Sequence, residues 1–277
     1  MKSAIVFLGT ILCCLGFCSR ASAAETIHFE SVGDGFLVVN ATINGKNGRF
    51  LFDTGSGFSN VTPQFAKAMG CKPWGQITGY RMTGQALSMQ RCNHADVQIG
   101  SIHLSTQALG VFDIGKFVPP KLGHIDGTIA LDLFAGKTFT FSYAGHFLTV
   151  LSPTELLERT RKLSRVPVQL SREASGFSLD VNLPVTTSEG TAWFEMDSGN
   201  TSGAVIVGVP LAKSFGLDPS VKKPQKARIT LSNGLVFSGN TLVMPLILDG
   251  NLGTTFLKHY DVTLDLDSDK AWFKPHS

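Results

Sequence analysis

The sequence predicts a mostly β protein built from two copies of one unit, and three observations support this. First, two Asp-[Ser/Thr]-Gly tripeptides, at 53–55 and 197–199, each end a strand-like apolar run. Second, each is followed by a segment with Pro near its start and Gly at its end, at 63–70 and 210–216, which predicts a short helix. Third, residues 126–150 align with residues 249–273 without a gap. A single duplication explains all three.

The first residues have the pattern of a secretory signal peptide, which we place at residues 1–23: Lys2, then an apolar run, then small residues. The bulky Phe17 argues against lipidation of Cys18. Loss of the segment removes Lys2 and Arg20 and reduces the net charge from +3 to about +1. A charge this small argues against nucleic acid as the main partner. No later run approaches the roughly 20 apolar residues of a membrane span. We expect a secreted or periplasmic protein.

Only two of the five cysteines, Cys71 and Cys92, lie outside the expected signal peptide. In an oxidising compartment an even pair favours one disulfide, and two buried free thiols are the alternative. Two cysteines and scattered histidines show no spacing typical of zinc ligands. We therefore expect no metal.

Each half contains an early β-hairpin. Strand-like segments 38–43 and 49–52 flank a Gly- and Asn-rich turn, and segments 180–185 and 192–196 flank a turn in the same way. Within the last of these segments, Glu195 alternates with apolar neighbours, so we expect it to face away from the core.

Between the two halves, residues 153–163 are charged, with leucines at roughly helical spacing, which predicts a surface helix. We therefore divide the mature chain into an N-terminal lobe at 24–151, a helical linker at 152–165 and a C-terminal lobe at 166–277.

The paired tripeptides are the one arrangement that implies chemistry. Two carboxylates held face to face cannot both ionise easily, so they share a proton and can act as acid and base together. Paired carboxylates also serve glycosidases, but a glycosidase would not explain the Gly after each Asp or the repeated downstream motifs.

Four motifs carry a resemblance to a known family: FLFDTGSG at 50–57, FEMDSGNT at 194–201, IDGTIALDLF at 125–134 and LDGNLGTTFL at 248–257. The chain resembles the aspartic proteases, in the bilobed pepsin-like or retropepsin-like form, and among them the compact bacterial members. The resemblance covers nearly the whole mature chain. It implies an all-β fold with few short helices, in which each lobe is a small closed β-barrel with a psi-shaped loop crossing.

The resemblance also implies roles for the residues of both tripeptides, and no cofactor. Asp53 and Asp197 would be the catalytic pair. Thr54 and Ser198 would hydrogen-bond across the lobes, and Gly55 and Gly199 would let backbone N–H groups approach the carboxylates. Ser56 would donate to the outer oxygen of Asp53. Asn200 stands where the family usually has Ser or Thr, and its amide could donate the same bond to Asp197.

The two halves differ in one spacing. Gly70 and Asp126 are 56 residues apart, whereas Gly216 and Asp249 are only 33 apart. The first lobe therefore has about one extra hairpin, where the family places the flap that closes over substrate. The candidate flap residues are Tyr80, Thr83 and Gly84. An ordinary surface hairpin is the alternative.

On this basis we expect a monomeric aspartic endopeptidase that takes a peptide or protein substrate in extended conformation. The competing hypothesis is a non-catalytic module on the same fold that binds peptides or proteins without cutting them. Retention of both Asp residues favours the enzyme.

Overall fold

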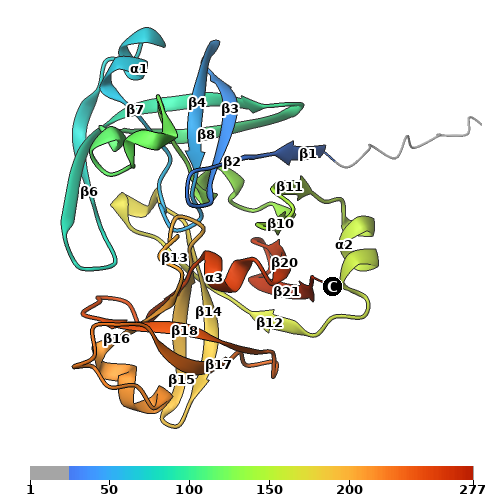
Figure 1. Cartoon of the computed structure of the whole chain (residues 1–277). Helices are drawn as coiled ribbons and strands as arrows, with labels where there is room; N and C mark the ends of the chain where they lie inside the picture. The colour runs from blue at the N-terminus through green and yellow to red at the C-terminus, as the bar shows by residue number, and fades with distance from the viewer. Residues whose placement is uncertain (1–24, 277) are drawn as a thin grey trace, which may run out of the picture.

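The computed structural model describes residues 25–276 as a mostly β fold with short helices, which confirms the predicted fold class. The predicted signal peptide at 1–23 lies outside the described residues. Figure 1 shows an upper lobe in blue and green, a lower lobe in yellow and orange, and further strands between them. No helix within residues 25–276 is long and apolar enough to cross a membrane.

The N-terminal lobe is built on an eight-stranded sheet. The predicted first hairpin is formed by its second and third strands, which pair from Leu37 with Phe52 to Ile43 with Lys46. In sheet order the strands are β2 (Glu30–Val32), β3 (Phe36–Ile43), β4 (Lys46–Phe52), β9 (Gly127–Ile129), β5 (Asn60–Val61), β8 (Ile102–Val111), β7 (Ala86–Ile99) and β6 (Trp74–Tyr80).

Helix α1 (Pro63–Ala68) follows β5 where the sequence predicts it. Its N-cap is Thr62, whose hydroxyl accepts a hydrogen bond from the Phe65 N–H and so satisfies one free donor of the first turn. The lobe also has short 3-10 turns at Ile114–Lys116, Pro120–Leu122 and Leu131–Phe134.

The C-terminal lobe repeats this plan on a seven-stranded sheet. In sheet order its strands are β13 (Gln169–Ser171), β14 (Asp180–Thr187), β15 (Gly190–Met196), β19 (Gly250–Leu252), β16 (Val205–Gly208), β18 (Val236–Met244) and β17 (Gln225–Thr230). Its helical segments are 3-10 turns at Ala174–Gly176 and Val209–Phe215, and helix α3 (Thr254–Leu257). The turn at Val209–Phe215 corresponds to α1 and ends at Gly216, which has a φ of +67°.

A third sheet joins the lobes and was not predicted from the sequence. Its strands, in order, are β1 (Glu25–His28), β11 (Phe147–Val150), β10 (Thr138–Ser142), β20 (Tyr260–Asp265), β21 (Lys270–Pro275) and β12 (Arg165–Pro167). The two copies meet where β10 and β20 pair antiparallel. Helix α2 (Pro153–Thr160), which begins with a Ser152–Glu155 capping box, lies in the predicted linker between the lobes.

The same loop crossing occurs in both lobes. Strand β4 pairs in parallel with β9, and β15 pairs in parallel with β19. The pairing extends one residue past each first strand, because the Asp53 N–H donates to the Ile129 carbonyl (3.0 Å) and the Asp197 N–H donates to the Leu252 carbonyl (3.1 Å). Each Asp therefore sits where its strand ends and the chain turns away.

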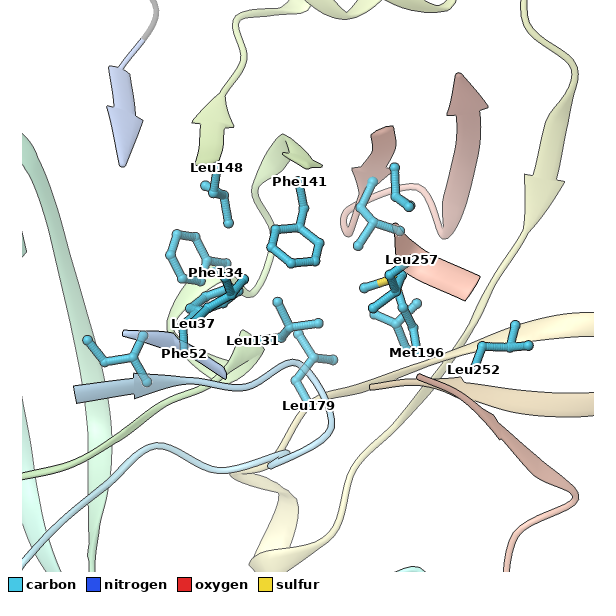
Figure 2. Packing of buried hydrophobic residues seen from close by; sticks show 14 of the residues in the cluster. Leu37, Phe52, Leu131, Phe134, Phe141, Leu148, Leu179, Met196, Leu252 and Leu257 are labelled. Atoms are coloured by element: carbon cyan, nitrogen blue, oxygen red, sulfur yellow. The ribbon is translucent and has the colours of Figure 1, made fainter. Parts of the chain in front are cut away.

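One apolar core runs behind these crossings and includes residues of both lobes (Figure 2). Phe52 stacks on Phe29 with ring centroids 4.4 Å apart and contacts Phe141 at 5.5 Å. Met196 is fully buried on the opposite side. A buried side chain of this size contributes about 1.5–3 kcal/mol. Because Phe52 and Met196 directly precede the two Asp residues, this packing holds both Asp backbones in place.

The extra hairpin of the first lobe is β6–β7, which corresponds in place to the predicted flap. Cys71 and Cys92 are joined by a disulfide, with Cα atoms 6.0 Å apart, and this confirms the predicted pairing. Cys92 lies in the middle of β7, so the bridge ties the base of the hairpin to the segment after α1.

Candidate active site

The ends of β4 and β15 bring the two Asp-[Ser/Thr]-Gly loops face to face. A Cβ atom added to Gly199 would lie 2.6 Å from Asp53 Cγ, and one added to Gly55 would lie 2.6 Å from Asp197 Oδ1. Real Cβ atoms do not approach other atoms this closely, so both positions require glycine. The two glycines thus permit each loop to pack directly on the carboxyl group of the other lobe.

Thr54 and Ser198 link the two loops through a reciprocal set of buried hydrogen bonds. The Thr54 N–H donates to Ser198 Oγ (3.0 Å), and the Ser198 N–H donates to Thr54 Oγ1 (2.9 Å). The Thr54 hydroxyl then donates to the Met196 carbonyl at 2.7 Å, whereas the Ser198 hydroxyl reaches the Phe52 carbonyl at 3.5 Å. The two loops are therefore held together by hydrogen bonds, and of the two hydroxyl-to-carbonyl bonds the one from Thr54 is shorter.

The two carboxyl groups receive different numbers of backbone donors. Asp53 Oδ1 accepts from the Gly55 N–H (3.0 Å). Asp197 Oδ1 accepts from both the Gly199 N–H (2.7 Å) and the Asn200 N–H (3.0 Å).

Two side-chain hydrogen bonds expected from the sequence, Ser56 to Asp53 and the Asn200 amide to Asp197, are not formed among residues 25–276. Among the hydrogen bonds of residues 25–276, none joins the Ser56 side chain to Asp53; the Ser56 N–H instead donates to the Asp53 carbonyl (3.4 Å). The Asn200 amide does not reach Asp197 either, and its Nδ2 donates to Asn251 Oδ1 (2.7 Å). Asn200 thus supports Asp197 through its backbone N–H and through Asn251.

Sequence reasoning missed Asn251 as a site residue and misjudged Glu195. Asn251 Nδ2 donates to Asp197 Oδ2 (2.7 Å) and to Glu195 Oε2 (2.9 Å). Glu195 alternates with the buried Phe194 and Met196 as expected, but its own face is also covered and only 8% of the residue is exposed. Glu195 and Asn251 stand in motifs where the other copy has Leu51 and Thr128, and these two differences between the copies are the signal that could have revealed the pair.

A different polar pair supports the crossing in the N-terminal lobe. Ser59 Oγ donates to Asp132 Oδ1 (2.5 Å) and accepts from the Ala130 N–H (2.9 Å), while the Ser59 N–H also donates to Asp132 Oδ1 (3.1 Å). Burial raises the pKa of Asp132 to about 7, although these hydrogen bonds oppose the shift. The pair holds the loop after β9 against the loop after Asp53.

Acidic groups crowd the site and shift one another's titration. Burial, then the charge of Asp197, raises the pKa of Asp53 well above its ordinary value. Burial, then the charges of Glu173, Asp197 and Asp132, raises the pKa of Asp180 to about 8. The Asp180 carboxylate would lie 2.8 Å from a Cβ on Gly57, which places it beside the first loop. The described residues include no group of three or more His, Cys, Asp or Glu arranged to hold a metal ion.

The β6–β7 hairpin reaches the other lobe. The Tyr80 N–H donates to Glu173 Oε2 (3.3 Å), and the Met82 carbonyl accepts from the Ile247 N–H (2.9 Å). Tyr80 is 56% exposed, and no hydrogen bond of its hydroxyl occurs among the described residues. Figure 1 shows this hairpin descending from the upper lobe toward the lower lobe. Thr83 and Gly84 lie in its turn, where Gly84 has a φ of +85°.

Residues 39–132, which include Asp53 and its crossing, match the family described as aspartyl protease. The matched segment is therefore similar to that family, and the whole chain has the pepsin-like fold. A search of curated proteins gave no match.

Solved structures with the same fold extend over nearly the whole chain. The aspartic proteinase from Irpex lacteus is 15% identical, with a TM-score of 0.55, and the alignment covers 92% of this chain and 98% of that one. Basic 7S globulin from soybean is 9% identical, with a TM-score of 0.59 and coverage of 92% and 95%. Identities this low show a shared fold and nothing more.

Proposed function

We propose that this protein is an aspartic endopeptidase in which Asp53 and Asp197 together activate a water molecule. The observation that carries the proposal is the face-to-face packing of the two loops, with each glycine against the opposite carboxyl group. Two carboxyl groups this close share one proton, which gives one acid and one base at the same place. The aspartyl protease match over residues 39–132 supports the same reaction class.

The reaction follows from that shared proton. The ionised carboxylate takes a proton from water as the water oxygen bonds to the scissile carbonyl carbon, and the protonated carboxyl donates to the carbonyl oxygen. The resulting tetrahedral intermediate collapses when the C–N bond breaks and the leaving nitrogen accepts the proton that the first carboxylate took from water. One carboxyl regains a proton from the new acid product, so the pair returns to its starting state.

We propose an extended peptide or protein substrate and a secreted or periplasmic location for a monomeric enzyme. The edge strand β6 of the flap offers backbone groups with which an extended chain could pair. The Cys71–Cys92 disulfide fits an oxidising compartment, in agreement with the signal-peptide pattern at 1–23.

Incubation of the mature protein with a mixed peptide library, from about pH 3 to about pH 8, tests this proposal. We expect mass spectrometry to show new internal termini that are absent with Asp197→Asn, a nearly isosteric control. A folded wild-type protein that leaves every peptide intact but retains some of them on a column would instead support the peptide-binding module.

A further inference from the structure

The buried side chain of Asn251 has every hydrogen-bonding group of its amide occupied. Its Oδ1 accepts from Asn200 Nδ2 (2.7 Å), and its Nδ2 donates to Asp197 Oδ2 (2.7 Å) and to Glu195 Oε2 (2.9 Å). A flipped amide would put its oxygen against two carboxyl groups and its nitrogen against another nitrogen. The network therefore fixes which end of Asn251 faces Asp197.

This contact makes the two members of the dyad unequal. Asp197 accepts from three N–H donors, those of Gly199, Asn200 and Asn251. Among the hydrogen bonds of the described residues, Asp53 accepts one, from Gly55. Hydrogen bonds donated to a carboxylate favour its ionised form, so the negative charge of the pair is stabilised on Asp197.

We propose that Asn251, held by Glu195 and Asn200, is a positioning residue that keeps Asp197 ionised, so that Asp197 is the base and Asp53 carries the shared proton. This inference rests on the proposed peptidase function for its kinetic consequences. The asymmetry of the two carboxyl groups is a property of the folded protein and can be measured without turnover.

Glu195 orients Asn251 without adding charge in acid. It lies on β15 between β14 and β19, with Asn182 and Asn251 as its direct cross-strand neighbours. The acidic groups around it are Asp197, Asp180 and Asp53. Burial, then the charges of Asp197 and Asp180, raises the pKa of Glu195 well above its ordinary value. A neutral Glu195 can still accept the Asn251 hydrogen bond while leaving Asp197 as the charged group.

The corresponding positions of the N-terminal lobe lack this hydrogen-bond network and so provide a control. Strand β4 has the buried Leu51 two residues before Asp53, and β9 has Thr128 in the place of Asn251. The Thr128 hydroxyl is buried and has no hydrogen-bond partner. Thr128→Val therefore tests a buried polar-to-apolar change at the corresponding place near the other Asp.

The kinetic test compares Asn251→Leu, Glu195→Gln and Thr128→Val on one peptide substrate over pH. Loss of a hydrogen bond to a charged group should lower kcat for Asn251→Leu about 10- to 100-fold and raise the acid-limb pKa by about one to two units, because Asp197 becomes harder to ionise. Glu195→Gln keeps an acceptor for Asn251 and should leave the acid limb in place. Thr128→Val should do the same. An unmoved acid limb in Asn251→Leu, with only a lower Tm, would show a purely structural role.

A second measurement does not depend on activity, and its first comparison uses the wild-type protein. Carbon-13 NMR of labelled Asp carboxyl groups shows which carboxyl group ionises first in the wild-type protein as pH rises. The variants Asp53→Asn and Asp197→Asn assign the two resonances. We expect Asp197 to ionise first and its titration to move upward in Asn251→Leu or Asn251→Thr. Ionisation of Asp53 first would overturn the inference, even in an active peptidase. The expected titration in a protein that cleaves no peptide would uphold the asymmetry and reject the peptidase proposal.

Discussion

The two Asp loops share one backbone design and differ in the side chains that support it. In the C-terminal lobe a buried amide and a buried acid, Asn251 and Glu195, reach the carboxyl group of Asp197 itself. In the N-terminal lobe the polar pair Ser59 and Asp132 supports the neighbouring backbone and not Asp53. The two lobes share the crossing as a scaffold but differ in its polar contacts, so the two carboxyl groups have different surroundings.

A second difference lies directly after β9 and β19, where Ala130 and Gly253 are corresponding residues. A Cβ on Gly253 would lie 2.6 Å from both the side-chain Cγ and the backbone oxygen of Asn200, so this position requires glycine. The corresponding position of the first lobe is Ala130, which is fully buried, and the residue in the place of Asn200 is the smaller Ser56. The chain therefore passes closer to the Asp loop at Gly253 than at Ala130, whose Cβ is accommodated.

The largest effect on activity should come from removing either of the two carboxylates. Asp53→Asn and Asp197→Asn should each lower kcat by about a thousandfold or more, and the double variant should lose little beyond either single one, because the pair acts as a unit. Steady-state kinetics checks this, with circular dichroism as the control for folding. Additive losses would mean that the two loops act independently.

The Ser59–Asp132 pair of the N-terminal lobe should make the stability of the protein depend on pH. Because the pKa of Asp132 rises from an unfolded value near 4 to about 7, the unfolded state releases this proton first as pH rises. Stability should therefore be highest in acid and fall by up to about 4 kcal/mol between about pH 4 and pH 7 from this group alone.

Asp132→Asn removes that titration, so its unfolding free energy should vary less over the same range in urea unfolding. Asp267→Asn, at an exposed position, is the control and should retain the wild-type slope. An Asp132→Asn slope equal to the wild-type slope would show that Asp132 does not take up its proton on folding.

The disulfide lies in the N-terminal lobe, so its removal should lower the stability of that lobe and loosen the β6–β7 hairpin. Residues 71 and 92 close a loop of 21 residues, for which the chain-entropy model gives roughly 3 kcal/mol. The double variant Cys71→Ser/Cys92→Ala should lower Tm and raise KM through a looser flap. Its pH profile should match that of wild type, since neither residue contacts the dyad. A shifted pH profile would mean that the bridge acts on the dyad and not only on the flap.

The smallest effect concerns the link between the loops. Thr54→Val removes a buried hydroxyl that donates at 2.7 Å and also accepts, and should cost about 2–3 kcal/mol in unfolding free energy. Ser198→Ala removes a hydroxyl that accepts from the Thr54 N–H at 3.0 Å but donates only at 3.5 Å, and should cost about 1–2 kcal/mol. Equal costs in chemical unfolding would show that the link is symmetric after all.

Much of this fold followed from the sequence because its signals are local. The tripeptides, the short helices and the hairpin turns are defined by neighbouring residues. Because the chain is duplicated, a pattern found in one copy also supports the same structural prediction in the other. The extra 23 residues between Gly70 and Asp126, relative to the second copy, were enough to predict the β6–β7 hairpin.

The contacts that distinguish the lobes depend on long-range register and could not be read in the same way. Glu195 meets Asn251 only because β15 and β19 pair in parallel at that residue. Its strand alternation predicted the correct face, but not that this face is covered. The shared sheet was missed for a similar reason, since β10 and β20 belong to different copies and each alone resembles an ordinary lobe strand.

In the proposed mechanism Asp53 and Asp197 share one proton, and the pH–rate profile of the mature protein on a single peptide tests this most directly. A pair with one proton is competent only between its two titrations, so kcat/KM should be bell-shaped with its maximum on the acid side of neutrality. A rate that climbs steadily to about pH 9 and is lost on addition of a chelator would contradict the account, because a two-carboxyl site that has lost its shared proton has no acid left to donate.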